Sequence, residues 1–397
     1  MDGEDLNHRI EALAEQATAL ARAGRTMQAI DLLRRALELV GTVPSRSARQ
    51  QAEGALRWRL ASALQALGHD DEAESELHRG LAALSHVPHV RDAEHDRIRT
   101  LIVLVELLTQ QTRLDEAEDV LRECRETIPV PEDHILHLAY LDAFAQWLNV
   151  SGRHAEAVAC LRRTTAHYRR IAGADANLSS SLEQLALAES AIGDIDDAVS
   201  HAREVVEIRE KTGFPAVYVG SARTTLANVL MAAGRMREFS EEVKKAGEFL
   251  AGDPEQGIQA KFLLVRSYSE AMAGRFAQAL RFSEKALEAA RGAIRRKPML
   301  EAECLIDIGG GRSVQGDLGG AIAAFTQAKT ILMDSGAPPM SVVVCLVGAA
   351  RAYSRAGLFP LAMATLDEAR DFLGPDVRRR ERVHFDSAQA QTFLRWA

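Results

Sequence analysis

The side chains that could do chemistry in this sequence are its cysteines, its histidines and one run of glycines. The cysteines are Cys124, Cys160, Cys304 and Cys345. None lies in a C-x-x-C pair, and this usage favours packing residues in a reducing compartment over a disulfide framework, a metal site or a redox pair. Two histidine groups stand near expected ends of helices, namely His86, His89 and His95, and Asp133, His134 and His137. Neither group has a completing set of ligands, so solvated histidines are favoured over zinc.

The run Gly309-Gly310-Gly311-Arg312 imitates a phosphate-binding loop. It lacks the G-x-x-x-x-G-K-[ST] pattern, and the chain also lacks G-x-S-x-G and H-E-x-x-H. Gly309 falls in a column of small residues described below, which favours close helix packing or a local bend over phosphate binding. The sequence therefore predicts a protein that is not an enzyme, with no catalytic residues, no cofactor and no metal.

Composition and charge exclude several other classes of protein. The 397 residues carry a formal net charge of −8, so no general basic field attracts nucleic acid. The basic runs at 295–297 and 378–382 have no interleaved aromatic residues for base stacking. The most apolar run, 342–350, is shorter than the roughly 18 residues that span a bilayer, and the N-terminus lacks a secretory pattern. We expect a cytoplasmic protein with neither a nucleic acid nor a membrane as partner.

A repeat organises almost the whole chain. A glycine is followed five residues later by alanine, with threonine in place of glycine at 112 and phenylalanine in place of alanine at 239. The turn positions are 24, 68, 112, 152, 193, 234, 274, 316 and 357. Their mean spacing is about 41.6 residues over eight intervals. This regularity predicts nine copies of one structural unit.

Columns aligned on the turn position predict the structure of that unit. Seven residues before the turn every copy has a small residue, and four residues earlier still most copies have leucine. Apolar residues also recur nine and twelve residues after the turn, at the spacing of a helical stripe. Each unit is therefore predicted to be a helix, a glycine turn and a second helix, and the protein to be all-α. Prolines cluster between units, where they separate one helix pair from the next.

The small residue, the glycine and the following A-x3-[LF]-x2-A resemble the tetratricopeptide repeat, most clearly at 24–36 and 357–369. The 41-residue period resembles the long-helix subclass of kinesin light chains, Rap-type regulators and the sensor regions of STAND-type activators. This resemblance implies a right-handed α-solenoid of about nine repeats over residues 1–375. Residues 376–397 are predicted to form one amphipathic capping helix, with a partner-binding tail as the alternative.

The resemblance also implies that first helices line a concave groove, with side chains 13, 10, 6 and 3 residues before the turn. The candidate groove is polar and acidic in repeats 3 to 5, at Glu106, Asp142, Gln146, Asn149 and Glu183. It becomes apolar in repeats 7 to 9, where Leu264, Tyr268 and Met272 are candidates, and Asn228 and Arg351 are two further, polar candidates. Asn228 is accompanied by Thr224 rather than lysine, which argues against the clamp that grips chaperone tails.

Such a groove suits a protein or peptide partner with a basic segment and an apolar anchor, unless the terminal helix covers its apolar end. The leading hypothesis is a non-enzymatic scaffold or adaptor, a bacterial regulatory or signalling subunit. The bacterial source is suggested by arginine, which supplies 41 of the 48 basic residues, as in GC-rich genomes. The alternative is a ligand-sensing or peptide-sensing switch that changes solenoid pitch to control an effector. The sequence predicts no particular oligomeric state.

Overall fold

The computed structural model describes residues 3–22, 24–87, 91–128, 134–251, 256–293 and 297–373, together with 386–389 and 392. These residues contain no strand. They form two compact units, Met1–Pro215 and Ala216–Ala397, and each is considered by itself. Within the described ranges, no helix has both the length and the apolar character needed to span a membrane.

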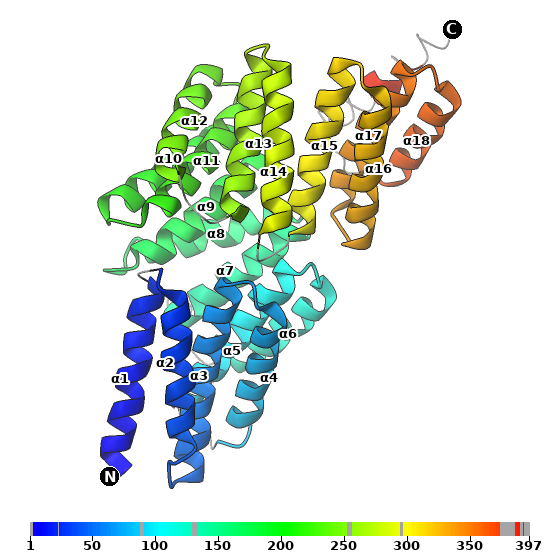
Figure 1. Cartoon of the computed structure of the whole chain (residues 1–397). Coiled ribbons are helices and arrows are strands. Elements are labelled where there is room, and N and C mark those ends of the chain that lie inside the picture. The colour runs from blue at the N-terminus through cyan, green and yellow to red at the C-terminus, as the bar shows by residue number, and fades with distance from the viewer. Residues whose placement is uncertain are drawn as a thin grey trace. The chain divides into compact units, whose positions relative to one another are not determined.

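Each unit consists of consecutive helices that pair as hairpins (Figure 1). The first unit contains α1 (Gly3–Arg22), α2 (Thr26–Val40), α3 (Arg46–Ala66), α4 (Asp70–Leu84), α5 (Arg91–Gln110), α6 (Leu114–Thr127), α7 (Ile135–Val150), α8 (His154–Tyr168), α9 (Asp175–Ile192) and α10 (Ile195–Lys211). The second unit contains α11 (Ala216–Ala232), α12 (Met236–Leu250), α13 (Gln256–Met272), α14 (Phe276–Gly292), α15 (Pro298–Gln315), α16 (Leu318–Asp334), α17 (Pro339–Arg355) and α18 (Phe359–Asp371).

The turn inside each hairpin is built in the same way nine times. Every predicted turn residue has a φ between 61° and 95°, the left-handed region in which glycine carries no Cβ penalty. The amide of the next residue then donates to the carbonyl five residues back, as from His69 to Leu64 at 3.0 Å and from Arg153 to Leu148 at 2.8 Å. This bond satisfies a carbonyl that the helix end leaves free. The predicted all-α fold of repeated helix pairs is confirmed.

Thr112 takes the left-handed conformation with a φ of 61° although it has a branched Cβ. Since this conformation costs such a residue roughly 1 to 2 kcal/mol, we expect Thr112→Gly to raise the free energy of unfolding by about 1 kcal/mol. Hydrogen exchange of α5 and α6 is the measurement, with Gly152→Thr as the matched reverse change, which should lower protection of α7 and α8. Slower exchange in wild type than in Thr112→Gly would contradict this account.

The columns of small and large residues form the core of the hairpins. Ala61, Ala145 and Ala186 are fully buried, so the helices approach closely. The cysteines are free thiols; burial raises the pKa of Cys124, Cys304 and Cys345 to about 12 and that of Cys160 to about 11. Low reactivity follows, because the thiolate is the reactive form.

Of the predicted capping helix only a part is described. Ala388 is fully buried and belongs to the same core cluster as Leu366 and Ala369 of α18. Residues 374–385 and the basic run at 378–382 lie outside the described residues, as do Arg295 and Arg296.

Candidate functional site

In each unit the first helices of successive hairpins line one face. α3 contacts α5 and α5 contacts α7 in the first unit, and α11 contacts α13 and α15 contacts α17 in the second. Within the described ranges the backbones of successive second helices lie farther apart, and side-chain ion pairs connect them, as between Arg34 and Glu72 or between Lys329 and Glu368. The set of helices whose backbones lie closer together is on the inside of a curve, so the first helices form the concave face of each unit. The residues predicted to face the groove belong to these helices.

The acidic part of the first unit is centred on Glu106 of α5 and Asp142 of α7. Burial, together with the charge of Asp142, raises the pKa of Glu106 to about 7. Burial also raises the pKa of Asp142 to about 7, although two hydrogen bonds favour its charged form. These come from the hydroxyl groups of Tyr168 at 2.9 Å and Ser181 at 2.6 Å. The groove thus contains two half-buried carboxyl groups that change charge near neutral pH.

The other polar candidates of the first unit differ in how far their side chains are already bonded within the protein. Glu183 is bound by the buried Arg209, whose Nη2 lies 2.6 Å from the carboxylate, so much of its charge is neutralised inside the protein. The side-chain oxygen of Asn149 lies 3.4 Å from Nδ1 of His154. Gln146 is half-buried on α7, one turn beyond Asp142. The groove is therefore less acidic than the sequence suggests.

Two contributions to this groove were not among the predicted site residues. Tyr168 lies at the end of α8, outside the aligned columns, and its pKa is raised by burial and by Asp142. Trp58 of α3 donates its indole N–H to Asp96 at 3.1 Å, and the guanidinium groups of Arg59 and Arg99 lie over its ring. Trp58 occupies a groove column, so its aromatic type was the signal that could have singled it out.

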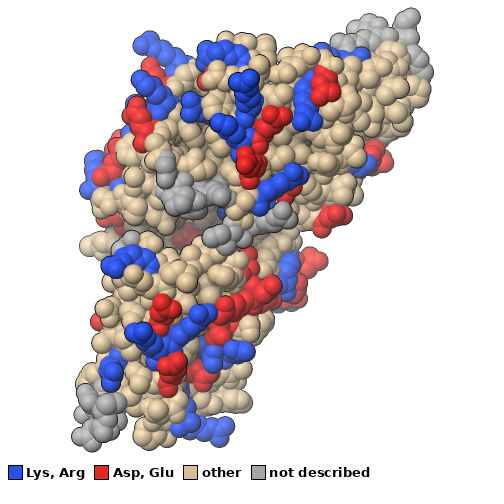
Figure 2. Space-filling model, in the orientation of Figure 1, with Lys and Arg blue, Asp and Glu red and all other residues tan. Residues whose placement is uncertain are grey.

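The groove candidates of the second unit include exposed apolar side chains. Tyr268 and Met272 of α13 are 36% and 56% exposed, while Leu264, Asn228 and Arg351 are half-buried. The ring of Tyr268 packs edge-on against the buried Phe239 at 5.8 Å. This contact explains why repeat 6 departs from alanine at that position. On the face that Figure 2 shows, acidic and basic side chains are interleaved rather than segregated.

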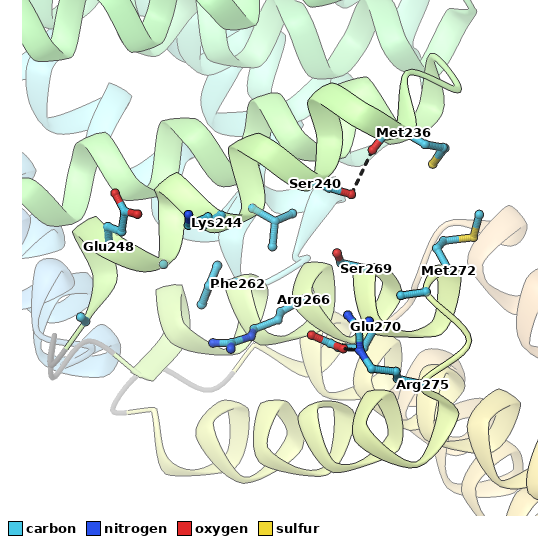
Figure 3. Close-up of a pocket in the computed structure, with 14 residues that line it drawn as sticks. Met236, Ser240, Lys244, Glu248, Phe262, Arg266, Ser269, Glu270, Met272 and Arg275 are labelled. Atoms are coloured by element: carbon cyan, nitrogen blue, oxygen red, sulfur yellow. Dashed lines mark hydrogen bonds and ion pairs between the residues drawn. The ribbon is translucent and has the colours of Figure 1, made fainter.

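A cavity of about 790 Å³ lies between α12 and α13, where repeats 6 and 7 meet. Figure 3 shows Ser240 of α12 and Ser269 of α13 on its two sides. The cause is visible in the repeat columns: eight residues before the turn, repeat 7 has Arg266, whereas seven other repeats have an apolar residue there. These are Leu60, Leu104, Phe144, Leu185, Leu226, Ile308 and Ala349.

Arg266 does not fill the space between the two helices. Its guanidinium stacks on the ring of Phe282 at 4.5 Å, and Glu270 forms an ion pair with Arg275 at one end of the cavity. The interface between repeats 6 and 7 is therefore looser than one closed by leucine.

Within the ranges that the structure describes, no group of three or more His, Cys, Asp or Glu residues could hold a metal ion. His89 and Asp133, which belonged to the two histidine groups, lie outside those ranges. Gly309 is a packing residue as predicted, since a Cβ there would lie 2.8 Å from the ring of Phe325.

Comparisons with known proteins agree with this architecture. The Tetratricopeptide repeat model matches residues 132–211, and no curated protein matches the chain. A crystal structure of a Rap protein complexed with Competence and Sporulation Factor covers 87% of this chain and 97% of its own, with 12% identity and a TM-score of 0.60. The apo form of RapI covers 86% and 97%, with 11% identity and a TM-score of 0.50. The chain is thus an α-solenoid of tetratricopeptide-like helical hairpins.

Proposed function

We propose that this chain is a non-enzymatic scaffold or adaptor that binds a protein or peptide on its concave face, as a bacterial regulatory subunit. One observation carries the proposal: the first helices expose large apolar side chains on the face where they are in contact with one another. Leu187 of α9 and Val344 of α17 are 46% and 52% exposed at groove positions. Leu187 belongs to the first unit and Val344 to the second, and exposed apolar residues on a concave face are typical of interaction surfaces.

The test compares leucines of similar exposure on the two faces. Leu187 lies in the groove column of α9, and Leu361 of the second helix α18 is 51% exposed. Partners recovered by affinity purification from the native host are titrated calorimetrically against wild type, Leu187→Arg, Val344→Arg and Leu361→Arg. We expect at least one groove variant to weaken binding tenfold or more, about 1.4 kcal/mol, and Leu361→Arg to bind as wild type.

The internal bonds of Asp142 and Glu183 make them poorer probes, because lysine at either position would also disrupt the fold. Wild-type affinity of both groove variants for every recovered partner would refute binding on the concave face.

A second candidate function is a switch that senses a peptide or small ligand. It is favoured by the cavity between α12 and α13, because opening or closing the interface of two neighbouring repeats changes the pitch of a solenoid. The Rap protein that shares the fold was crystallised in complex with Competence and Sporulation Factor. Small-angle scattering with and without recovered ligands separates the candidates, since an adaptor keeps one pitch and a switch changes it.

A further inference from the structure

A second cavity, of about 540 Å³, lies on the concave face of the second unit among α13, α14, α15 and α17. One part of its lining is apolar and open to solvent, with Phe276, Val314 and Val344 each about half exposed. Another part carries the carboxyl groups of Glu303 and Asp307, and none of the lining residues is lysine or arginine. The cavity therefore joins an apolar surface to an anionic one.

Asp307 is held in place by two hydroxyl groups that only repeat 7 provides. Its Oδ2 accepts hydrogen bonds from Ser267 at 2.8 Å and Ser283 at 2.5 Å, and both serines are buried. In the other eight repeats the column of Ser267 contains Ala, Val or Gly, and that of Ser283 contains Leu, Ala, Val or Phe. The two hydroxyl groups also lie 2.8 Å from each other, and together they position Oδ2 of Asp307, which leaves Oδ1 for a further donor.

Glu303 precedes Asp307 by four residues on α15, so the two carboxyl groups lie on the same face of the helix. It is exposed to solvent, yet desolvation by the surrounding protein raises its pKa more than Lys261 lowers it. A cation placed in the cavity would interact favourably with both carboxyl groups.

Gly310 keeps the cavity open. It lies inside α15, where glycine is less favourable than alanine, yet a Cβ there would meet no atom within 4 Å. Its neighbour Gly309 must be glycine because a Cβ there would clash with Phe325, but no packing contact requires glycine at position 310. Any larger side chain at 310 would project into the cavity that Gly310 lines.

We propose that this cavity is the specificity pocket of the groove, which takes a peptide segment with a lysine or arginine beside a large apolar side chain. Asp307 and Glu303 bind the cation, and Phe276, Val314 and Val344 contact the apolar side chain. The inference rests on the proposed peptide-binding function and names the chemistry of the partner.

Nonapeptides of random sequence displayed on phage are selected on the purified full-length chain, and affinities of selected peptides are measured by fluorescence anisotropy. We expect selected sequences to share lysine or arginine beside Leu, Ile, Met or Phe. Gly310→Leu, which fills the pocket, and Asp307→Asn should each weaken binding at least tenfold, and salt should weaken it further. Gly319→Leu is the matched control, because Gly319 of α16 also has open space at its Cβ but does not line the cavity, and it should bind as wild type.

Circular dichroism and hydrogen exchange verify that each variant is folded. The assignment of the pocket would be wrong if the selected peptides lacked the pair of basic and apolar residues. It would also be wrong if they bound Gly310→Leu and Asp307→Asn as tightly as wild type. The same would follow if selection enriched no peptide. If those peptides lost affinity for Leu187→Arg instead, the groove would keep its proposed function while this pocket would not.

Discussion

Replacing Phe239 with alanine is expected to lower the free energy of unfolding of the second unit by about 3 to 4 kcal/mol. Alanine is the residue that the other eight repeats have at this position, so the repeat pattern alone suggests a harmless change. Phe239 is only 1% exposed, however, and its ring contacts Tyr268 edge-on. Its removal leaves a large void between α12 and α13, next to an interface that Arg266 already leaves loose.

Hydrogen exchange measured by mass spectrometry is suited to this prediction, because a repeat protein need not unfold in one step. Peptides of α11, α12 and α13 should lose protection in Phe239→Ala, while those of α3 and α4 in the first unit keep it. Phe276→Ala is the control, since Phe276 is 45% exposed and should change stability by less than about 0.5 kcal/mol. A loss below about 1 kcal/mol in Phe239→Ala would mean that repeat 6 packs as its neighbours do.

The fold could be predicted from the sequence because a solenoid repeats the same local sequence signals in each hairpin. The turn residue, the small residue before it and the apolar stripe after it recur along the nine copies. The turn at Thr112 could therefore be predicted from the other copies, although glycine is missing there. Local signals of this kind depend on residues within one hairpin. The division into two compact units, at Pro215, has no comparable local signal.

The candidate site could be predicted less completely, because contacts between hairpins decide whether a polar side chain in the groove is free to bind a partner. Glu183 has the same sequence signal as Asp142, yet only the fold brings the buried Arg209 to its carboxylate. The serines that hold Asp307 come from two other helices, and only their departure from the columns of the other repeats pointed to them. Column exceptions such as Ser267, Ser283 and Arg266 were thus the informative residues, while the prediction had relied on the columns themselves.

Glu106→Gln is expected to raise the free energy of unfolding at pH 8 by about 2 kcal/mol and to change it little at pH 4. In the folded protein the pKa values of Glu106 and Asp142 are both about 7, well above their values in an unfolded chain. Between about pH 4 and pH 7 the folded state therefore binds more protons than the unfolded state. Stability is full below that interval, falls as the pH rises through 7, and is lowest above it. Glutamine cannot ionise, so the variant loses this part of the pH dependence.

Asp142→Asn separates charge from hydrogen bonding. Asparagine is also neutral, but its amide nitrogen cannot accept a hydrogen bond, so either Tyr168 or Ser181 loses the acceptor that it now has. We expect this variant to be less stable than wild type by about 1 to 2 kcal/mol at pH 4, with the deficit shrinking toward pH 8 as the wild-type carboxylates ionise. Urea unfolding from pH 4 to pH 8, followed by the fluorescence of Trp58 and Trp147 in the first unit, measures both variants. If the free energy of unfolding of wild type and of Glu106→Gln changed with pH in parallel, the two carboxyl groups would titrate as they do in water. A groove with two such ordinary acids would attract basic peptides without any dependence on pH near 7.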